Sequence, residues 1–323
     1  MFYEPFAEIN EIYKFGRDGV IIFFILSGFI ISWCASERDK TFAVFAINRA
    51  SRIYSVALPA LLLGMVVNMF TSLNNAEPLH YPFEKLWIYF PIYITFTGNF
   101  WNLSETPPGN FPYWSLNYEV WYYIIFAALF YGGSRWKYFL AIFFMLCVGP
   151  NILQLFPLWL MGSALYFISR RIKLNPLFSI LGVIISTASI ISIKYLQLDN
   201  YADKYNYLLF SNTPQLLGDY LIGIMVLLNL TFALNLDFLS HTTSCFLIRK
   251  LASYSFSFYL FHIPVFSLLN HFVIHNNSLV FYMIILIISC LVIVLLAHFT
   301  EHKKNCYRIN FRNFVDKFNS NTV

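Results

Sequence analysis

The sequence is most informative where polar side chains interrupt long apolar stretches. Glu119 lies five residues after Trp114, the start of one such stretch, and Ser115 lies four residues before Glu119 on the same helical face. His262 lies near the middle of another stretch, with Tyr259 among its neighbours on one face. A charged side chain at the centre of a membrane helix costs roughly 2.5–3.5 kcal/mol on insertion, so such residues are functional candidates. A carboxylate and an imidazole could position a hydroxyl group and remove its proton.

A structural role is the alternative for both residues. Glu119 could be an interfacial carboxylate that still contacts water, because the start of its apolar stretch is not sharply defined. His262 could bond a main-chain carbonyl, since Pro264 has no N–H and leaves the carbonyl of Leu260 without its helical donor. The functional interpretation makes Glu119 and His262 the catalytic candidates.

Two arginines, Arg49 and Arg52, flank the start of a further apolar stretch and share one helical face through their i, i+3 spacing. Two guanidinium groups on one face suit a phosphate-bearing ligand, because each presents a planar fork of donors. The alternative is a plain anchor, in which basic residues hold the cytoplasmic end of a membrane helix.

Small residues mark the first apolar stretch of the chain. Gly19, Ser27 and Gly28 would let helices or a ligand chain approach closely. Two charged residues, Arg17 and Asp18, lie at the mouth of this stretch, and we expect them to be solvated.

We expect no metal site. The sequence contains no HExxH motif or comparable ligand set. No two cysteines form a CxxC pair, so we interpret all five as small apolar or boundary residues. They are Cys34, Cys147, Cys245, Cys290 and Cys306.

The composition indicates what must position these residues. Of the 323 residues, 59% are hydrophobic and only 11% are charged, against roughly 25% in a typical soluble domain. This excludes a disordered chain and argues against a soluble enzyme, because a soluble surface needs more charge. The prediction is an all-α, polytopic transmembrane helix bundle. The net charge of +5 fits basic loops on one face of a bilayer, so we expect a lipid bilayer as a partner and no nucleic acid.

Nine apolar spans are expected, together with one interfacial or re-entrant segment at residues 86–101. The segment is broken by Pro91, Gly98 and Asn99. Residues 1–302 would form the integral membrane domain, and residues 303–323 a basic tail. The spans cover residues 19–34, 53–70, 114–131, 138–169 (a hairpin of two), 177–196, 216–236, 251–274 and 279–299.

The distribution of basic loops predicts the orientation. If residues 86–101 do not cross, every basic loop falls on the cytoplasmic side, and the C-terminus is cytoplasmic. The first span then enters from the outside without a leader before it. We therefore expect that a preceding helix is missing from this sequence.

Four sequence elements together resemble the membrane-bound acyltransferase-3 family. Residues 19–30 (GVIIFFILSGFI) are similar to its GVxxFFxLSGF element, and residues 49–54 (RASRIY) to its RxxRIYP element. Residues 114–122 (WSLNYEVWY) and 253–264 (SYSFSFYLFHIP) are similar to its WSLxxExxFY and SYSxYLxHxP elements. Glu301, after the last span, also fits the usual ending of the family. The elements occur in the family's order and cover nearly the whole chain.

The resemblance implies a multi-pass enzyme of the bacterial inner membrane. Such enzymes move an acyl group, usually acetyl, from coenzyme A to a hydroxyl group of a cell-surface or lipid-linked saccharide, such as O-antigen. The expected partners are acyl-CoA and a saccharide acceptor. Acetyl-CoA is a co-substrate, and no cofactor is expected to be tightly bound.

This sequence departs from the family in three places. Ser55 replaces the proline of the arginine element, and Ile21 replaces a common acidic residue. The family's first helix, which carries an arginine and a histidine, has no counterpart here.

These observations combine into a mechanistic hypothesis. Arg49 and Arg52 would bind the phosphates of coenzyme A, and the thioester would pass Ser27 and Gly28. Glu119 and His262 would act on the sugar hydroxyl, which Ser115 and Tyr259 would help to position. A direct attack is expected, because no nucleophile elbow or Cys–His arrangement is present. The alternatives are an inactive truncated acyltransferase remnant or a saccharide transporter or flippase, although the sequence has no internal repeat of the kind common in transporters.

Overall fold

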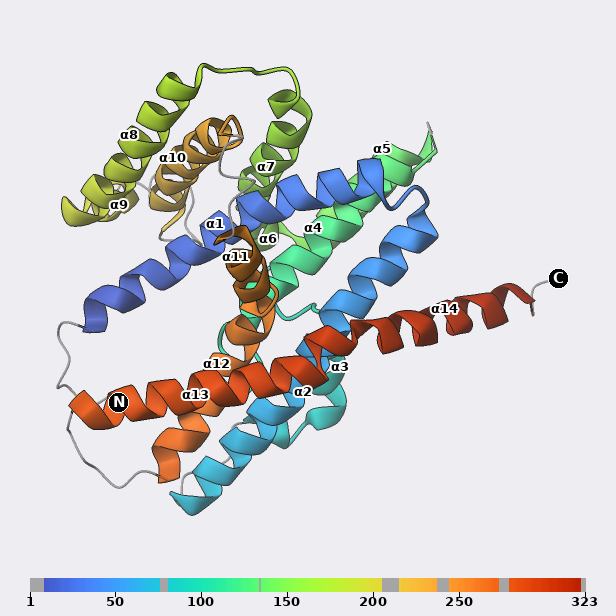
Figure 1. Ribbon diagram of the computed structural model, residues 1–323. Helices are drawn as coiled ribbons and strands as arrows, with labels where there is room; N and C mark the ends of the chain where they lie inside the picture. The colour runs from blue at the N-terminus through green and yellow to red at the C-terminus, as the bar shows by residue number, and fades with distance from the viewer. Residues whose placement is uncertain are drawn as a thin grey trace. The chain divides into compact units, whose positions relative to one another are not determined.

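The apolar stretches of the sequence fold into helices in the computed structural model (Figure 1). The structure describes residues 9–75, 81–133, 135–204, 215–236, 244–272 and 279–320. Within these ranges the regular structure is entirely helical, with no strand. A helix satisfies its main-chain polar groups internally, which is what a lipid environment requires.

The helices differ widely in length. The longest, α2, has 33 residues and contains Pro59. In chain order the elements are α1 (Ile9–Glu37), α2 (Phe42–Asn74), η1 (Tyr81–Phe83), α3 (Leu86–Ile94), α4 (Tyr113–Tyr131), α5 (Trp136–Val148), α6 (Pro150–Leu153), α7 (Phe156–Ser169), α8 (Pro176–Tyr195), α9 (Leu198–Asp203), α10 (Leu216–Ala233), α11 (Ser244–Ala252), α12 (Ser255–Phe272), α13 (Leu279–Phe299), η4 (Glu301–Lys303) and α14 (Lys304–Ser320).

Six helical segments of the described chain are long and apolar enough to cross a membrane. The expected number of nine spans is therefore not confirmed, and these six candidate spans correspond to six of the nine. Helix α5, with 13 residues, is short for a span. Helices α4 and α12 are outside the six because tyrosine, serine and histidine side chains lower their mean hydropathy. The six are Gly16–Glu37, Phe42–Asn74, Pro150–Ser169, Pro176–Tyr195, Leu216–Ala233 and Tyr282–Asn313.

The segment at residues 86–101 contains only a short helix. Helix α3 has nine residues, about 14 Å at the rise of an α-helix, so it is too short to cross a bilayer as a helix. After it the chain turns, and Phe96 and Trp101 take positive φ angles of 58° and 50°. This break coincides with Gly98 and Asn99, whereas Pro91 lies inside α3.

The chain divides into two compact units, and each is described by itself. The first comprises residues 1–39, 100–102 and 119–245, and the second comprises residues 40–99, 103–118 and 246–323. Helix α4 contributes its first six residues to the second unit and the rest to the first.

Helix α1 is central to the first unit. It packs along α7 and against α10, and α10 also packs on α8 and α9 (Figure 1). The contact between α1 and α7 depends on two glycines, Gly28 and Gly162. A Cβ atom at Gly28 would lie 2.0 Å from the carbonyl oxygen of Trp159, and one at Gly162 would lie 1.8 Å from that of Ile25. The two backbones can approach this closely only because glycine at both positions has no side chain.

In the second unit α2 packs against α12 and α14, and α12 packs against α13. Glu301 closes one end of this group. Its Oε2 accepts hydrogen bonds from the N–H (3.2 Å) and the hydroxyl (2.7 Å) of Ser257. Ser257 lies in the first turn of α12, where the helix leaves N–H groups unsatisfied and favours negative charge.

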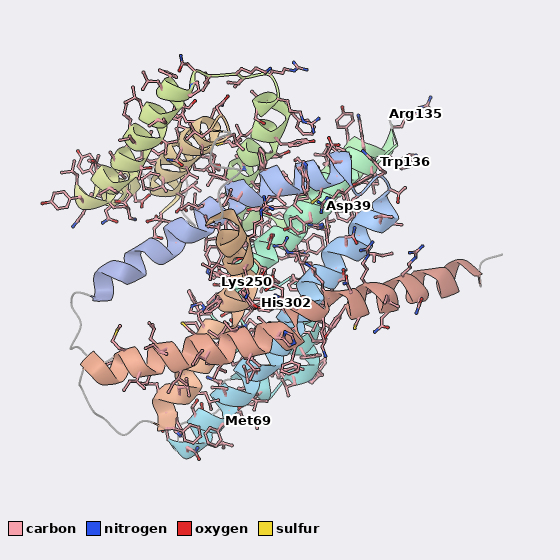
Figure 2. The ribbon with its side chains drawn as sticks, viewed as in Figure 1. Asp39, Met69, Arg135, Trp136, Lys250 and His302 are labelled. Atoms are coloured by element: carbon pink, nitrogen blue, oxygen red, sulfur yellow. The ribbon has the colours of Figure 1, made fainter. Side chains whose placement is uncertain are left out.

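Large apolar side chains are exposed in both units. Trp136 on α5 is 65% exposed and Met69 on α2 is 41% exposed, and Figure 2 labels both. Helices α8 and α13 carry runs of exposed isoleucine, leucine and phenylalanine. Soluble proteins rarely expose so much contiguous apolar surface, so these faces suit contact with lipid.

Candidate functional site

Glu119 lies in a buried hydrogen-bonded cluster of the first unit. Its Oε1 accepts a hydrogen bond from the hydroxyl of Ser27 on α1 (3.1 Å) and another from the hydroxyl of Tyr123. The Trp159 ring N–H donates to the oxygen of Ser27 (3.3 Å). All four side chains are less than 9% exposed. The alternative of a water-exposed interfacial carboxylate therefore does not describe Glu119.

This cluster explains how a carboxyl group is accommodated among apolar helices. A buried charged or polar group is costly unless it is hydrogen-bonded. The Trp159 N–H, the Ser27 hydroxyl and the carboxyl group of Glu119 form a relay of donors that ends on an acceptor oxygen. The same arrangement fixes the orientation of the carboxyl group, which a reacting group requires.

His262 lies on α12 in the second unit, and its ring is held by main-chain carbonyls. Its Nδ1 is 3.1 Å from the carbonyl oxygen of Phe258 and 2.9 Å from that of Tyr259. Since a carbonyl can only accept, Nδ1 carries the proton, and Nε2 of the neutral ring carries the lone pair. His262 is exposed. It is thus set as the tautomer that can accept a proton at Nε2.

The carbonyl that Pro264 frees has a different partner. The side-chain amide of Asn110 donates to the carbonyl of Leu260 (3.2 Å) and also approaches that of Ala60 (3.4 Å). The suggested structural role, in which His262 bonds the carbonyl freed by Pro264, is therefore taken by Asn110.

Ser115 and Tyr259 are brought together. Their hydroxyl oxygens lie 2.6 Å apart, and both are within hydrogen-bonding distance of the carbonyl oxygen of Pro112, at 3.2 Å and 2.9 Å. The rings of Tyr259 and His262 are 6.3 Å apart. Ser115 is buried and Tyr259 is half-buried. Ser115 therefore helps to hold Tyr259, whose ring lies beside that of His262.

Arg49 and Arg52 lie in the third turn of α2, in the second unit. Arg52 is exposed, whereas Arg49 is half-buried with its guanidinium 5.9 Å from the centre of the Phe45 ring. Ser55, which stands where the family pattern has proline, donates its hydroxyl to the carbonyl of Arg52 (3.0 Å). The helix thus continues through this position without a kink-forming residue.

Gly28 contacts the main chain of α7, and Ser27 makes a hydrogen bond to Glu119. Gly28 lies against the main chain at Trp159, which uses the space that its missing side chain provides. Ser27 is part of the Glu119 cluster. Gly19 differs from Gly28, because an added Cβ there would meet no atom within 4 Å.

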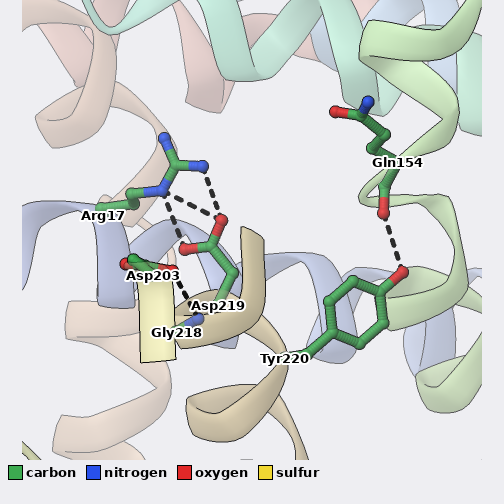
Figure 3. Close-up of polar contacts among 6 residues, drawn as sticks. All are labelled: Arg17, Gln154, Asp203, Gly218, Asp219 and Tyr220. Carbon is green, nitrogen blue, oxygen red and sulfur yellow. Dashed lines mark hydrogen bonds and ion pairs between the residues drawn. The ribbon is translucent and has the colours of Figure 1, made fainter. Parts of the chain in front are cut away.

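The expectation that Arg17 and Asp18 are solvated is wrong. Arg17 donates from Nε and Nη2 to the carboxylate of Asp219 at 2.8, 3.1 and 2.5 Å, and Asp219 is only 4% exposed (Figure 3). Asp18 pairs with Lys194 at 2.9 Å, and Lys194 also pairs with Asp199 at 2.6 Å. Charges that are distant in sequence neutralise one another here, which offsets the cost of their partial burial.

The predicted residues thus form two local groups. Ser27 joins Glu119 in the first unit, and Ser115 joins Tyr259 beside His262 in the second. Glu119 and His262 belong to different units, so their joint action stays a prediction. Among the described residues, clusters of three or more histidine, cysteine, aspartate or glutamate side chains suited to a metal ion are absent.

Sequence reasoning missed several partners. Tyr123 lies four residues after Glu119, and this i, i+4 spacing was a usable signal. Trp159 and Asn110 carried no such signal, because their contacts cross to Ser27, Ala60 and Leu260 from distant parts of the chain.

Known proteins offer two comparisons with this chain. A family model described as an acyltransferase domain, of the acyltransferase-3 type, matches residues 3–298. The exopolysaccharide production protein ExoZ of Rhizobium meliloti (strain 1021) is 26% identical over 140 residues. That similarity covers 42% of this chain and 41% of ExoZ, so the chain matches less than half the length of this relative. No solved structure matches the chain.

Proposed function

This chain belongs to the acyltransferase-3 family, and from that premise we propose that it is an integral membrane enzyme that transfers an acetyl group from coenzyme A to a hydroxyl group of a cell-surface saccharide. The match over residues 3–298 carries the assignment of acyl transfer. The six apolar helices support a membrane location. The similarity to a protein of exopolysaccharide production supports a saccharide as the acceptor.

His262 is the proposed general base. The hydroxyl oxygen of the acceptor attacks the thioester carbonyl, and its proton passes to Nε2 of His262. The C–O bond forms, the C–S bond breaks, and coenzyme A leaves as the thiol after it receives the proton. The hydrogen bonds from Nδ1 to the carbonyls of Phe258 and Tyr259 support this role, because they set the tautomer that accepts at Nε2.

Glu119 is the second catalytic candidate. Its hydrogen bonds with Ser27 and Tyr123 hold the carboxyl group in one orientation. A carboxyl group held in this way can position the acceptor hydroxyl by accepting its hydrogen bond. Tyr259, held by Ser115, would position the acceptor beside His262.

The donor would be bound through its phosphates. Arg49 and Arg52 share one face in the third turn of α2. Guanidinium groups bind phosphates through paired, charge-assisted hydrogen bonds. In this proposal the two arginines bind the donor, and His262 transfers the proton. The C-terminus would be cytoplasmic in the bacterial inner membrane, the side on which coenzyme A is present.

The proposal is tested by incubating membranes that contain the full chain with radiolabelled acetyl-CoA and surface saccharide from the producing cells. Base-labile label on the saccharide measures the acetyl ester. His262→Gln and Glu119→Gln should each lower the rate by roughly 10²–10⁴-fold, the usual contribution of a positioned acid or base.

Matched controls are available on the same chain. His271 on α12 bonds Asn74, and Glu37 at the end of α1 pairs with Arg170. His271→Gln and Glu37→Gln should retain transfer. If the inserted wild-type chain forms no saccharide ester, the proposed function is wrong; if His262→Gln and Glu119→Gln both retain the wild-type rate, the residue roles are wrong.

A further inference from the structure

A charged cavity lies within the first unit, and its lining residues do not include those of the cluster around Glu119. Its volume is about 610 Å³. It is lined by the N-terminal part of α1, the C-terminal end of α8, α9 and the start of α10. Its charged lining residues are Arg17, Asp18, Lys194, Asp199, Asp203 and Asp219.

Ion pairs link the charged residues that line this cavity. Arg17 binds Asp219 through two nitrogens, and Lys194 binds Asp18 and Asp199 together (Figure 3 shows the arginine pair). Asp203 accepts a hydrogen bond from the N–H of Gly218 (2.8 Å). The lining groups are therefore fixed before any ligand arrives, which lowers the entropic cost of binding.

Other lining residues provide hydrogen-bonding amides and an aromatic ring, beside the apolar Ile190 and Ile191. Gln197, Asn200 and Gln215 each offer both a donor and an acceptor, as sugar hydroxyl groups require. A carboxylate has about four lone-pair sites, so the paired aspartates keep capacity to accept further hydrogen bonds. Tyr195 is 85% exposed and offers a ring face for the C–H face of a sugar.

The charge of the cavity discriminates among ligands. Four aspartates and two basic residues give a formal charge of −2, from 2 − 4. This charge disfavours the phosphates of coenzyme A and the carboxylates of acidic sugars. It does not oppose a neutral saccharide, whose hydroxyl groups can bond the fixed carboxylates and amides.

We propose that this cavity binds a neutral saccharide unit of the acceptor. The inference rests on the proposed function, because it assumes that the acceptor is a saccharide. It adds a binding site remote in sequence from Glu119 and His262, and it names the class of sugar. In the orientation predicted from the basic loops, the helix ends that line the cavity are the outer ones.

The test measures binding without a donor. Surface saccharide of the producing cells is fragmented, labelled with a fluorophore and separated by ion exchange into neutral and acidic fractions. Each fraction is titrated against the purified full chain in detergent. The neutral fraction should bind, and Tyr195→Ala should weaken its binding by about tenfold. Tyr138, an exposed tyrosine on α5 outside the cavity, provides the control variant Tyr138→Ala, which should bind as the wild type does.

A second variant tests the charge. Asp199→Asn combined with Asp203→Asn keeps an oxygen for Lys194 and for the N–H of Gly218 but removes two negative charges. It should strengthen binding of the acidic fraction relative to that of the neutral fraction by about tenfold, because the formal charge of the cavity rises from −2 to 0. Stronger binding of the acidic than the neutral fraction to the wild type, or equal binding to wild type and Tyr195→Ala, would overturn the inference.

The two proposals fail in different ways. If neutral fragments bind in the cavity but no acetyl ester forms with acetyl-CoA, the binding site stands and the proposed function fails. If acetyl transfer occurs with an unchanged Michaelis constant for saccharide in Tyr195→Ala, the function stands and the cavity inference fails.

Discussion

The side-chain amide of Asn110 donates a hydrogen bond to the main-chain carbonyl of Leu260 over 3.2 Å. Pro264 lies four residues after Leu260, and its ring leaves that carbonyl without a helical donor. The same amide approaches the carbonyl of Ala60 on α2. Asn110 thus supplies the hydrogen bond that α12 lacks at Leu260, and it also links α12 to α2.

Substitution of Asn110 by alanine should destabilise the chain by about 1–3 kcal/mol, because two buried carbonyls lose a donor. In a Pro264→Ala background the loss should be smaller by about 1 kcal/mol, since the alanine introduced there would supply the N–H that the carbonyl of Leu260 lacks. Thermal unfolding of the two single variants and the double variant in detergent measures this coupling. If the stability losses of the two single variants add up to that of the double variant, Asn110 does not supply the hydrogen bond that the carbonyl of Leu260 lacks.

The sequence predicted where helices form but not what joins them. Runs of isoleucine, leucine and phenylalanine were enough to place α8, α10 and α13, because burial in lipid selects such runs locally. Asn110 lies in an irregular segment before α4, where no periodicity reveals its partner. The pair of Arg17 and Asp219 joins positions 202 residues apart, a contact that depends on how helices pack.

The number of spans was hard to predict for a related reason. Glu119 and His262 are functional candidates because they interrupt apolar stretches, and polar residues of this kind also lower the mean hydropathy of α4 and α12. Residues 114–131 and 251–274 were expected as spans, whereas α4 and α12 are not among the six segments apolar enough to cross a membrane. The local residue groups were partly predictable, since Ser115 and Tyr259 do meet.

Gly28 provides a prediction about helix packing. Gly28→Ala should destabilise the contact between α1 and α7 by about 1–3 kcal/mol, because the new Cβ would overlap the main chain at Trp159. A Cβ there would lie 2.0 Å from the Trp159 carbonyl oxygen. Unfolding in detergent and the yield of folded protein in membranes measure the effect.

The matched control lies on the same helix. Gly19 is exposed, and an added Cβ would meet nothing within 4 Å. Gly19→Ala should raise stability by up to about 1 kcal/mol, because alanine favours the helix. Equal stability of the two variants would show that Gly28 does not require its missing side chain.

The two arginines of α2 provide a kinetic prediction. Combined Arg49→Ala and Arg52→Ala substitution should raise the Michaelis constant for acetyl-CoA by about tenfold or more, because hydrogen bonds to charged groups contribute on the order of 1.5–3 kcal/mol each. The constant for saccharide should change little. Initial rates at varied concentrations of each substrate separate the two effects.

Two exposed basic residues of the second unit, Arg249 and Lys250 on α11, serve as the control. Their combined replacement by alanine removes the same charge without touching α2. A rise in the acetyl-CoA constant that is equal in both double variants would assign the effect to net charge. No rise in the Arg49 and Arg52 variant would exclude these residues from donor binding.

Asp203 provides a prediction about pH. Burial raises the pKa of its carboxyl group above the ordinary value, and Asp199 acts in the same direction. The hydrogen bond from Gly218 N–H and the charges of Arg17 and Lys194 oppose this shift in pKa without cancelling it. The folded chain therefore binds this proton more tightly than the unfolded chain does, so stability from Asp203 is present at low pH and is lost as pH rises through the folded pKa.

Asp203→Asn removes this penalty and keeps an oxygen for Gly218. The variant should unfold at a higher temperature than the wild type at neutral pH. Its advantage should shrink as pH falls toward about 4, the ordinary aspartate pKa, because the wild-type carboxyl group is then protonated in the folded state. Thermal unfolding across a pH series measures the difference, with Glu84→Gln as an exposed control. If the difference in unfolding temperature between Asp203→Asn and the wild type grows at acid pH, the pKa of Asp203 is not raised by burial.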